Sequence, residues 1–159
     1  MFYSMQSQMS AFISRLTRSS TAVLFIGGLV LQTAIMLTFA LVWWDPGTVM
    51  ADSFTGWKQL LLVVVAAPLL ETLIFQYAII TSMLNTVRST ALAVFVSALA
   101  FCLTHFYSPQ YVVATFCSGI LFAILYLVFQ QKNNRGFLYV FLIHSIYNFF
   151  VFAMKHWFN

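Results

Sequence analysis

The segment Trp57–Leu84, WKQLLLVVVAAPLLETLIFQYAIITSML, is almost continuously apolar and contains one acidic residue, Glu71. At 1.5 Å per residue, a helix of this length can cross the ~30 Å hydrocarbon core of a bilayer. A strand of a membrane β-barrel would alternate polar and apolar side chains over about ten residues, and this segment does not alternate. The sequence therefore predicts a transmembrane helix with a carboxyl group near its middle.

Four further apolar runs are long enough to cross a bilayer, and short polar breaks separate them. They lie at Thr21–Trp44, Ser89–Phe106, Pro109–Gln130 and Gly136–Trp157. Of the 159 residues, 62% are hydrophobic and 6% are charged, far below the ~25% charge of soluble domains. We expect an all-α polytopic membrane protein of about five transmembrane helices, with a single helical domain over residues 21–159.

Residues 1–20 precede the first apolar run and are expected to form a tail. Apolar side chains recur there with a weak helical spacing, so the tail either lies on the membrane surface as an amphipathic helix or frays. The first apolar run is too long for the core of a secretory signal, which favours a retained helix.

The distribution of bases favours an orientation. Five of them fall on the side of the N-terminus and two on the other side, namely Arg15, Arg18, Arg88, Lys132 and Arg135 against Lys58 and Lys155. Because cytoplasmic loops carry an excess of Lys and Arg, we expect a cytoplasmic N-terminus and a C-terminus on the outer side. The bases are scattered without interleaved aromatic residues, so nucleic acid is excluded as a partner and the lipid bilayer is expected as the surroundings.

Four polar residues inside the predicted spans are candidate site residues. Glu71 lies near the bilayer midplane, where a charged side chain costs a few kcal/mol, and such residues usually mark functional sites. His105 ends the third span, and His144 and Asn148 share one face of the fifth at a spacing of four residues. Since none of these groups is cheap to bury alone, we expect all four to converge on one cavity.

Pro68 lies three residues before Glu71 and has no amide proton. In an α-helix this frees the carbonyl of Val64 and can kink the chain one turn before the carboxyl group. We expect backbone polarity to open into a cavity at this point.

Two chemistries fit these groups. A carboxylate in a dry pocket beside an imidazole can act as a general base toward water, with His and Asn donors holding the oxyanion of a hydrolysed amide. Glu71, His105 and His144 could equally ligate zinc. We favour the metal-free site, because His105 at a helix end and His144 at midspan are expected at different depths. Cys102 and Ser145 are weaker candidates as nucleophiles.

Three short motifs occur in order on successive predicted spans. The first is APLLETLIFQ at residues 67–76, the second is FCLTH at 101–105, and the third is HSIYN at 144–148. They resemble the motifs EExxxR, FxxxH and HxxxN of the CPBP intramembrane proteases, the CAAX-processing and bacteriocin-immunity (Abi) family. Phe116 and Gly119 match an intervening F-x-x-G stretch, and the resemblance covers about residues 60–151, essentially the catalytic core of that family.

This resemblance implies catalytic roles for the four candidates. Glu71 would be the base, His105 and His144 would assist it, and Asn148 would help to bind the oxyanion. Phe101 would be the first residue of the second motif. The first motif departs from the family pattern, since Thr72 replaces its second glutamate and Gln76 its arginine. The glutamate and the arginine of the family pattern could form an ion pair with each other. Losing both leaves no unpaired charge, which favours a divergent active member.

The resemblance implies an intramembrane endopeptidase of the bacterial inner membrane. Its substrate would be a membrane-anchored or lipid-modified protein cleaved near its C-terminal tail, and no cofactor is favoured although zinc is possible. One alternative is a non-catalytic immunity or scaffold protein with the same fold. A second, weaker alternative is a proton-coupled transporter, which would be expected to show paired broken helices.

Overall fold

The computed structural model describes residues 2–42 and 56–158, and within these ranges every regular element is a helix. The elements run in the order α1 (Phe2–Leu16), α2 (Thr21–Val42), α3 (Trp57–Leu61), η2 (Leu62–Ala66), α4 (Ala67–Glu71), η3 (Thr72–Ile79), α5 (Ile80–Thr86), α6 (Thr90–Cys102), α7 (Pro109–Asn133) and α8 (Gly136–Phe158). Four stretches are long and apolar enough to cross a membrane: Thr21–Val42, Trp57–Thr86, Pro109–Asn133 and Gly136–Met154. The prediction of an all-α polytopic membrane protein is confirmed.

The third predicted span is wrong in its length. The helix α6 has 13 residues and ends at Cys102, which gives it a length of about 20 Å, too short to cross the hydrocarbon core. The chain turns after Leu103, and Ser108 then caps α7 by accepting a hydrogen bond from the amide of Tyr111. His105 therefore lies in a loop and not on a helix. The first predicted span reaches Val42 as expected, and Trp43 and Trp44 lie outside the described residues.

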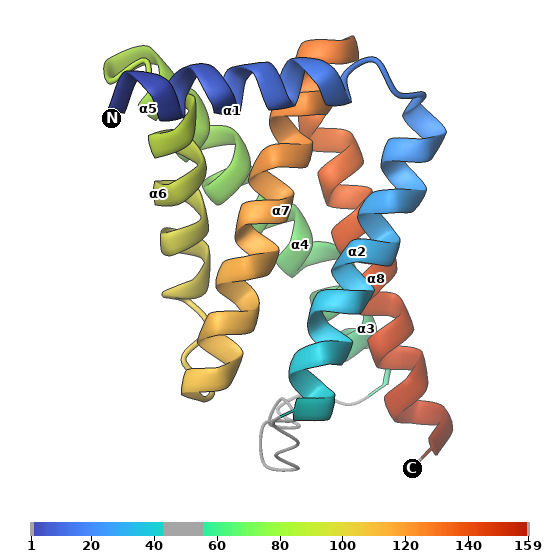
Figure 1. The fold of residues 1–159 in the computed structure, drawn as a ribbon. Coiled ribbons are helices and arrows are strands. Elements are labelled where there is room, and N and C mark those ends of the chain that lie inside the picture. Colours follow the sequence, from blue (N-terminus) through green and yellow to red (C-terminus); the bar gives the residue numbers. More distant parts are fainter. Residues whose placement is uncertain (1, 43–55, 159) are drawn as a thin grey trace.

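The N-terminal segment is helical rather than frayed. Figure 1 shows α1 running across one end of the bundle, over the ends of the helices there. Its Gln6 side chain donates a hydrogen bond to Thr90 Oγ1 at 3.2 Å and accepts one from the amide of Ala91 at 3.3 Å. Ile13 is buried against the bundle. The helix α1 thus fixes the start of α6.

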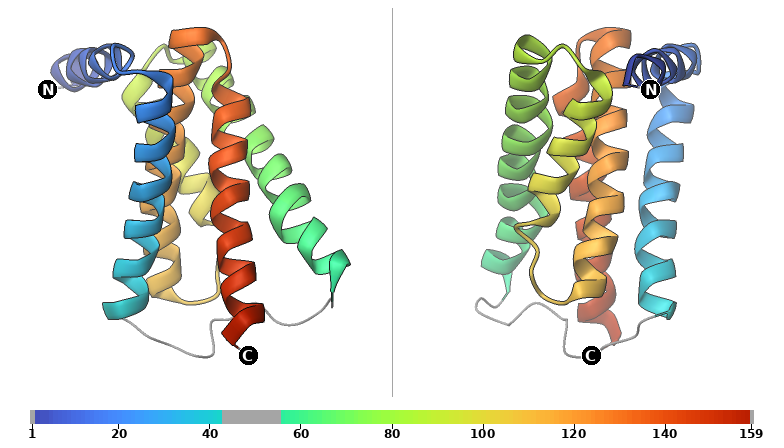
Figure 2. Two further views of the ribbon diagram at one scale, coloured as in Figure 1. Left: turned by 90° about the vertical axis from the view of Figure 1, so that its right-hand side faces the viewer. Right: turned by 60° about the vertical axis from the view of Figure 1, so that its left-hand side comes forward.

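The turn between α5 and α6 and the turn between α7 and α8 lie at the same end of the bundle as α1 (Figures 1 and 2). Arg88 belongs to the first turn, and Lys132 and Arg135 flank the second. Lys132 Nζ also donates a hydrogen bond to the carbonyl of Thr17, at 3.0 Å, just beyond α1. One end of the molecule therefore collects these bases.

The helix α7 is the centre of the bundle. It packs against α6, α8 and α2, and Figure 2 shows it among them in both views. Its Phe122, Phe129 and Val128 are fully buried, and Val140 and Ile143 of α8 complete this core. Of the four candidate membrane spans, α7 is the most buried within the protein.

The stretch Trp57–Thr86 forms one long helix that widens twice into π-helical turns, at η2 and at η3. In η2 the amide of Ala67 donates to the carbonyl of Leu62, five residues earlier. In this register the next amide, at position 68, would bond to the carbonyl of Val63, and Pro68 has no amide proton to give. The freed carbonyl is therefore that of Val63, and the expectation that it would be that of Val64 is wrong because it assumed an α-helical register.

Close packing of α6 on α7 depends on Gly119. A Cβ atom added there would lie 2.9 Å from Cα and 3.2 Å from the carbonyl oxygen of Ala98 on α6. Both are backbone atoms of α6, so they cannot move aside unless the whole helix moves. Small residues at such crossings allow membrane helices to approach closely.

We expect Gly119→Ala to destabilise the protein by about 1–3 kcal/mol, because α6 has to move away from α7. The matched control is Gly27→Ala on α2, where nothing lies within 4 Å of the added atom. Thermal unfolding in detergent should show a lower Tm for the first variant and an unchanged or slightly higher Tm for the second. Equal values for the two variants would contradict this account of the crossing.

Candidate active site

A cavity of about 710 Å³ opens within the bundle, and six parts of the chain form its walls. These are α2, the segment from α3 to η3, the end of α6, the loop between α6 and α7, α7 and α8. Most of its lining is apolar, and the four candidate residues from the sequence all contribute to the polar part, namely Glu71, His105, His144 and Asn148. The structure therefore brings them to one place although they come from three separate segments.

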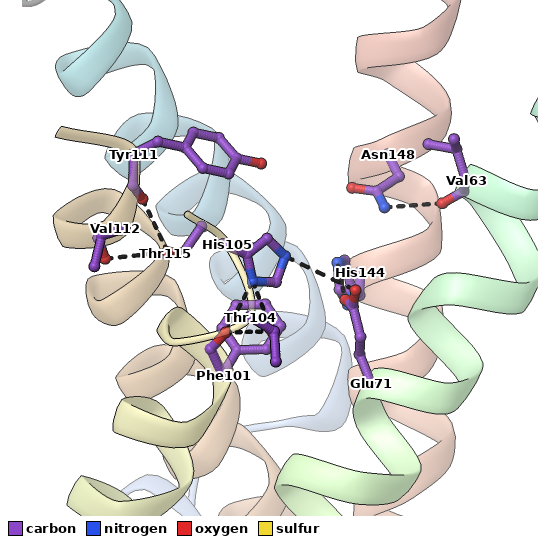
Figure 3. A network of polar contacts seen from close by, with 10 residues as sticks. All are labelled: Val63, Glu71, Phe101, Thr104, His105, Tyr111, Val112, Thr115, His144 and Asn148. Carbon is purple, nitrogen blue, oxygen red and sulfur yellow. Dashed lines mark hydrogen bonds and ion pairs between the residues drawn. The ribbon is translucent and has the colours of Figure 1, made fainter. Parts of the chain in front are cut away.

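Glu71, the last residue of α4, lies between the two histidines (Figure 3). Its Oε1 atom is 3.8 Å from Nε2 of His105, and its Oε2 atom is 3.6 Å from Nε2 of His144. The exposed fraction of the side chain is 24% for Glu71, 12% for His105 and 8% for His144. Both separations are longer than a direct hydrogen bond, so each imidazole faces the carboxyl group without bonding to it.

The imidazole of His105 has a defined tautomer. Its Nδ1 atom lies 2.8 Å from the carbonyl oxygen of Phe101 and 3.1 Å from Oγ1 of Thr104. A carbonyl oxygen only accepts hydrogen bonds, so Nδ1 carries the proton, and in the neutral ring Nε2 presents a lone pair to Glu71. Thr104 Oγ1 donates to the same carbonyl at 2.8 Å, which further fixes the loop.

The ring of Phe101 packs against the imidazole rings of both histidines. Its ring centroid is 4.6 Å from that of His105 and 6.0 Å from that of His144. Phe75 and Phe122 pack edge-on against the same ring at 5.6 and 6.0 Å. Phe101 is 2% exposed, so the first residue of the second motif is the packing centre that places the imidazoles.

The two histidines reach the same carboxyl group, so the expectation that they lie at different depths is wrong. The reason is that α6 ends early and the loop after it carries His105 back to Glu71. The depth argument for a metal-free site is therefore lost. Among the residues that the structure describes, no group of three or more His, Cys, Asp or Glu side chains is arranged to hold a metal ion.

Asn148 binds the helix that carries Glu71. Its Nδ2 atom donates a hydrogen bond to the carbonyl of Val63 at 2.9 Å (Figure 3). This is the carbonyl that Pro68 leaves without a backbone donor. A residue of the third motif thus compensates for the proline that accompanies the first, and the bond ties α8 to η2 beside the cavity.

The two departures from the family pattern, Thr72 and Gln76, lie one turn apart on η3 and are fully buried. Neither lines the cavity. Thr72 Oγ1 and both polar atoms of Gln76 have no hydrogen-bond partner among the described residues. These uncharged side chains are therefore packed in the protein interior and do not face the cavity that Glu71 lines.

The two nucleophile candidates also lie outside the cavity lining. Cys102 is buried, and its Sγ donates to the carbonyl of Leu99 at 3.2 Å, while Ser145 is buried on α8. Neither side chain therefore faces the cavity that contains Glu71.

Sequence reasoning missed several polar residues of the cavity, among them Tyr111 and Gln32. Tyr111, in the first turn of α7, extends its ring toward α8 in Figure 3. Gln32 of α2 is 3% exposed, and its Oε1 atom has no hydrogen-bond partner among the described residues. A signal for Gln32 existed in the sequence, because it is the one amide in an otherwise apolar predicted span, whereas a tyrosine near a helix end gives none.

Comparison with known protein families gives one match, to the family described as type II CAAX prenyl endopeptidase Rce1-like, over residues 53–150. The chain belongs to this family. The match includes all three motifs, and it leaves α1 and α2 outside. Neither the curated proteins nor the solved structures give a match. Because the family consists of proteases, the intramembrane endopeptidase activity expected from the sequence is supported at the level of the family, and the chain is an integral membrane protein.

The bond between Asn148 and Val63 predicts coupling between α8 and the proline. Asn148→Leu should lower stability by about 0.5–2 kcal/mol, because a backbone carbonyl loses its partner in an apolar interior. Pro68→Ala restores an amide proton at position 68, which lets the helix satisfy the Val63 carbonyl in either the α or the π register. The loss caused by Asn148→Leu should therefore shrink in the Pro68→Ala background.

A double-mutant cycle of unfolding free energies in detergent measures this coupling. Ser145→Ala on the same helix is the control, since it removes a buried polar atom that has no bond to Val63. Additive effects of the Asn148 and Pro68 substitutions would contradict the proposed compensation.

Proposed function

We propose that this protein is an intramembrane endopeptidase in which Glu71 activates water for attack on a peptide bond. The observation that carries the proposal is one carboxyl group held between two imidazoles in a cavity of an apolar helical bundle. An ionisable group in the middle of a membrane span is costly to bury. A protease that works inside the membrane therefore needs a polar cavity formed by its own side chains.

The tautomer of His105 supports a role for it in binding that water. Its Nε2 lone pair and the Glu71 carboxylate are both acceptors, and they face each other at 3.8 Å. A water molecule can donate one hydrogen to each, which relieves the repulsion and leaves its own lone pairs free to attack. His144 faces the second oxygen of Glu71 at 3.6 Å, so the carboxyl group has an imidazole on each side.

The proposed reaction then proceeds in two steps. The water oxygen forms a bond to the carbonyl carbon of the substrate, Glu71 takes the released proton, and the electron pair of the carbonyl moves onto its oxygen. The tetrahedral intermediate collapses as the C–N bond breaks, and the leaving nitrogen takes the proton from Glu71. Water is the only co-reactant, and the carboxylate is regenerated.

The substrate that we propose is a membrane-anchored or lipid-modified protein cleaved near its C-terminus. The family description supports this class, and the apolar lining of the cavity suits a segment that enters from lipid.

We further propose a bacterial inner-membrane location with a cytoplasmic N-terminus, supported by the bases gathered at the end that carries α1. A reporter fused after Asn159 tests the orientation, and activity of a cytoplasm-only reporter at that point would reverse it.

Glu71→Gln should lower cleavage by about 10²–10⁴-fold, because it keeps the shape of the side chain and removes the basic oxygen. The assay uses purified protein in liposomes and a quenched fluorescent peptide that ends in a farnesylated CAAX sequence, with an unmodified transmembrane peptide as a second probe. Thermal stability should stay equal or rise slightly, since a costly ionisable group is gone.

Undiminished cleavage by Glu71→Gln would exclude the mechanism. A wild-type protein that cleaves neither probe would favour the non-catalytic immunity or scaffold alternative. A proton flux across the liposomes that depends on Glu71 and proceeds without cleavage would favour the transporter.

We also propose that turnover requires no metal. In the same assay a chelator should leave the rate of cleavage unchanged, and metal analysis of the active protein should find no stoichiometric zinc. Reversible loss of activity with the chelator, together with one bound zinc per chain, would replace the general base by a site in which Glu71, His105 and His144 are ligands.

A further inference from the structure

Tyr111 lines the cavity, and its hydroxyl has no hydrogen-bond partner among the described residues. The Ser108 cap fixes the first turn of α7, and there the Tyr111 ring lies 6.0 Å from the His105 ring and 5.3 Å, edge-on, from the Tyr107 ring. The residue lines the same cavity as Glu71. Figure 3 shows its hydroxyl oxygen at the tip of a ring that extends toward the side of α8 bearing His144 and Asn148.

Some hydrogen-bond donors of the site already have acceptors within the protein, and one does not. Nδ1 of His105 is bound to the carbonyl of Phe101, and one amide proton of Asn148 is bound to the carbonyl of Val63. The Tyr111 hydroxyl has no hydrogen-bond partner among the described residues, although the neighbouring Thr115 hydroxyl is satisfied by backbone carbonyls. Because Tyr111 is half-buried and lines the cavity, its hydroxyl remains available to donate a hydrogen bond to a ligand there.

We propose that the Tyr111 hydroxyl donates a hydrogen bond to the oxygen of the scissile carbonyl, and that it stabilises the charge on this oxygen when water adds. This inference rests on the proposed endopeptidase function and adds a catalytic residue to it. A phenol keeps its proton at neutral pH, so it can serve as a donor throughout the reaction. The O–H bond does not break: as the water oxygen bonds to carbon, the displaced electron pair stays on the carbonyl oxygen and Glu71 holds the proton.

The position of Tyr111 suits this role. The water is placed by Glu71 and His105, and the donor has to approach the carbonyl from another wall so that the carbonyl carbon lies between them. Tyr111 projects from α7, whereas Glu71 is on α4 and His105 is in the loop. The amide of Asn148 is anchored to Val63, so its second proton can assist only from that fixed position.

The test is Tyr111→Phe, which keeps the ring and its contacts with His105 and Tyr107 and removes only the hydroxyl. With the farnesylated CAAX peptide, kcat should fall by about 10²-fold while KM stays within about twofold, as for loss of an oxyanion donor. A phosphinate peptide, whose tetrahedral oxygen mimics the intermediate, should bind more weakly by the same factor. The corresponding uncleaved peptide bound to Glu71→Gln should keep its affinity when Tyr111→Phe is added.

Tyr139→Phe is the matched control, because this ring stacks on Phe129 at 4.4 Å and does not line the cavity. It should leave kcat unchanged. Tyr147 lines the cavity from α8, so Tyr147→Phe asks whether that tyrosine is the donor instead.

Several outcomes would overturn the proposal. These are an unchanged kcat for Tyr111→Phe, a loss that appears with Tyr147→Phe and not with Tyr111→Phe, and a loss that comes with a lower Tm and weaker binding of the uncleaved peptide. Failure of the wild-type protein to cleave either probe would instead reject the proposed function, and the role of Tyr111 with it.

Discussion

Placing the carboxyl group of Glu71 at the middle of an apolar helix is the constraint on which the arrangement of the other site residues depends. In lipid the ionised group would cost a few kcal/mol, so the surrounding segments have to screen it and give it polar neighbours. The structure does so with the His105 loop on one side and α8 on the other, each bringing an imidazole within 4 Å of the carboxyl oxygens. The short α6 and the central position of α7 both serve this arrangement.

The helix that carries Glu71 is itself irregular, and its irregularity is satisfied from outside. The π register of η2 places the unpaired carbonyl of Val63 opposite α8, where Asn148 binds it. An unsatisfied carbonyl would be costly in a bilayer, so the bond stabilises the widened turn just before the carboxyl group. Pro68 in the first motif and Asn148 in the third therefore act on the same backbone carbonyl, which gives their occurrence in separate motifs a structural reason.

Aromatic packing gives the candidate site its rigidity. Phe101 contacts both imidazoles and two further phenylalanine rings, and it is almost completely buried. Since aromatic pairs have preferred geometries, this cluster restricts the orientation of His105 and His144 without adding a polar group. The Tyr111 ring, 6.0 Å from the ring of His105, extends the same packing to the cavity.

The sequence by itself determined that the chain is a helical membrane protein and that Glu71, His105, His144 and Asn148 are its informative polar residues. Both conclusions follow from local composition, because long apolar runs can satisfy their backbone in lipid only as helices and ionisable groups within them are expensive. Only the tertiary structure decided where α6 ends and the backbone register at Pro68. It also decided that Tyr111 and Gln32 face the cavity. These features depend on contacts between segments distant in the sequence, such as Asn148 with Val63, and hydropathy or periodicity within one segment cannot report them.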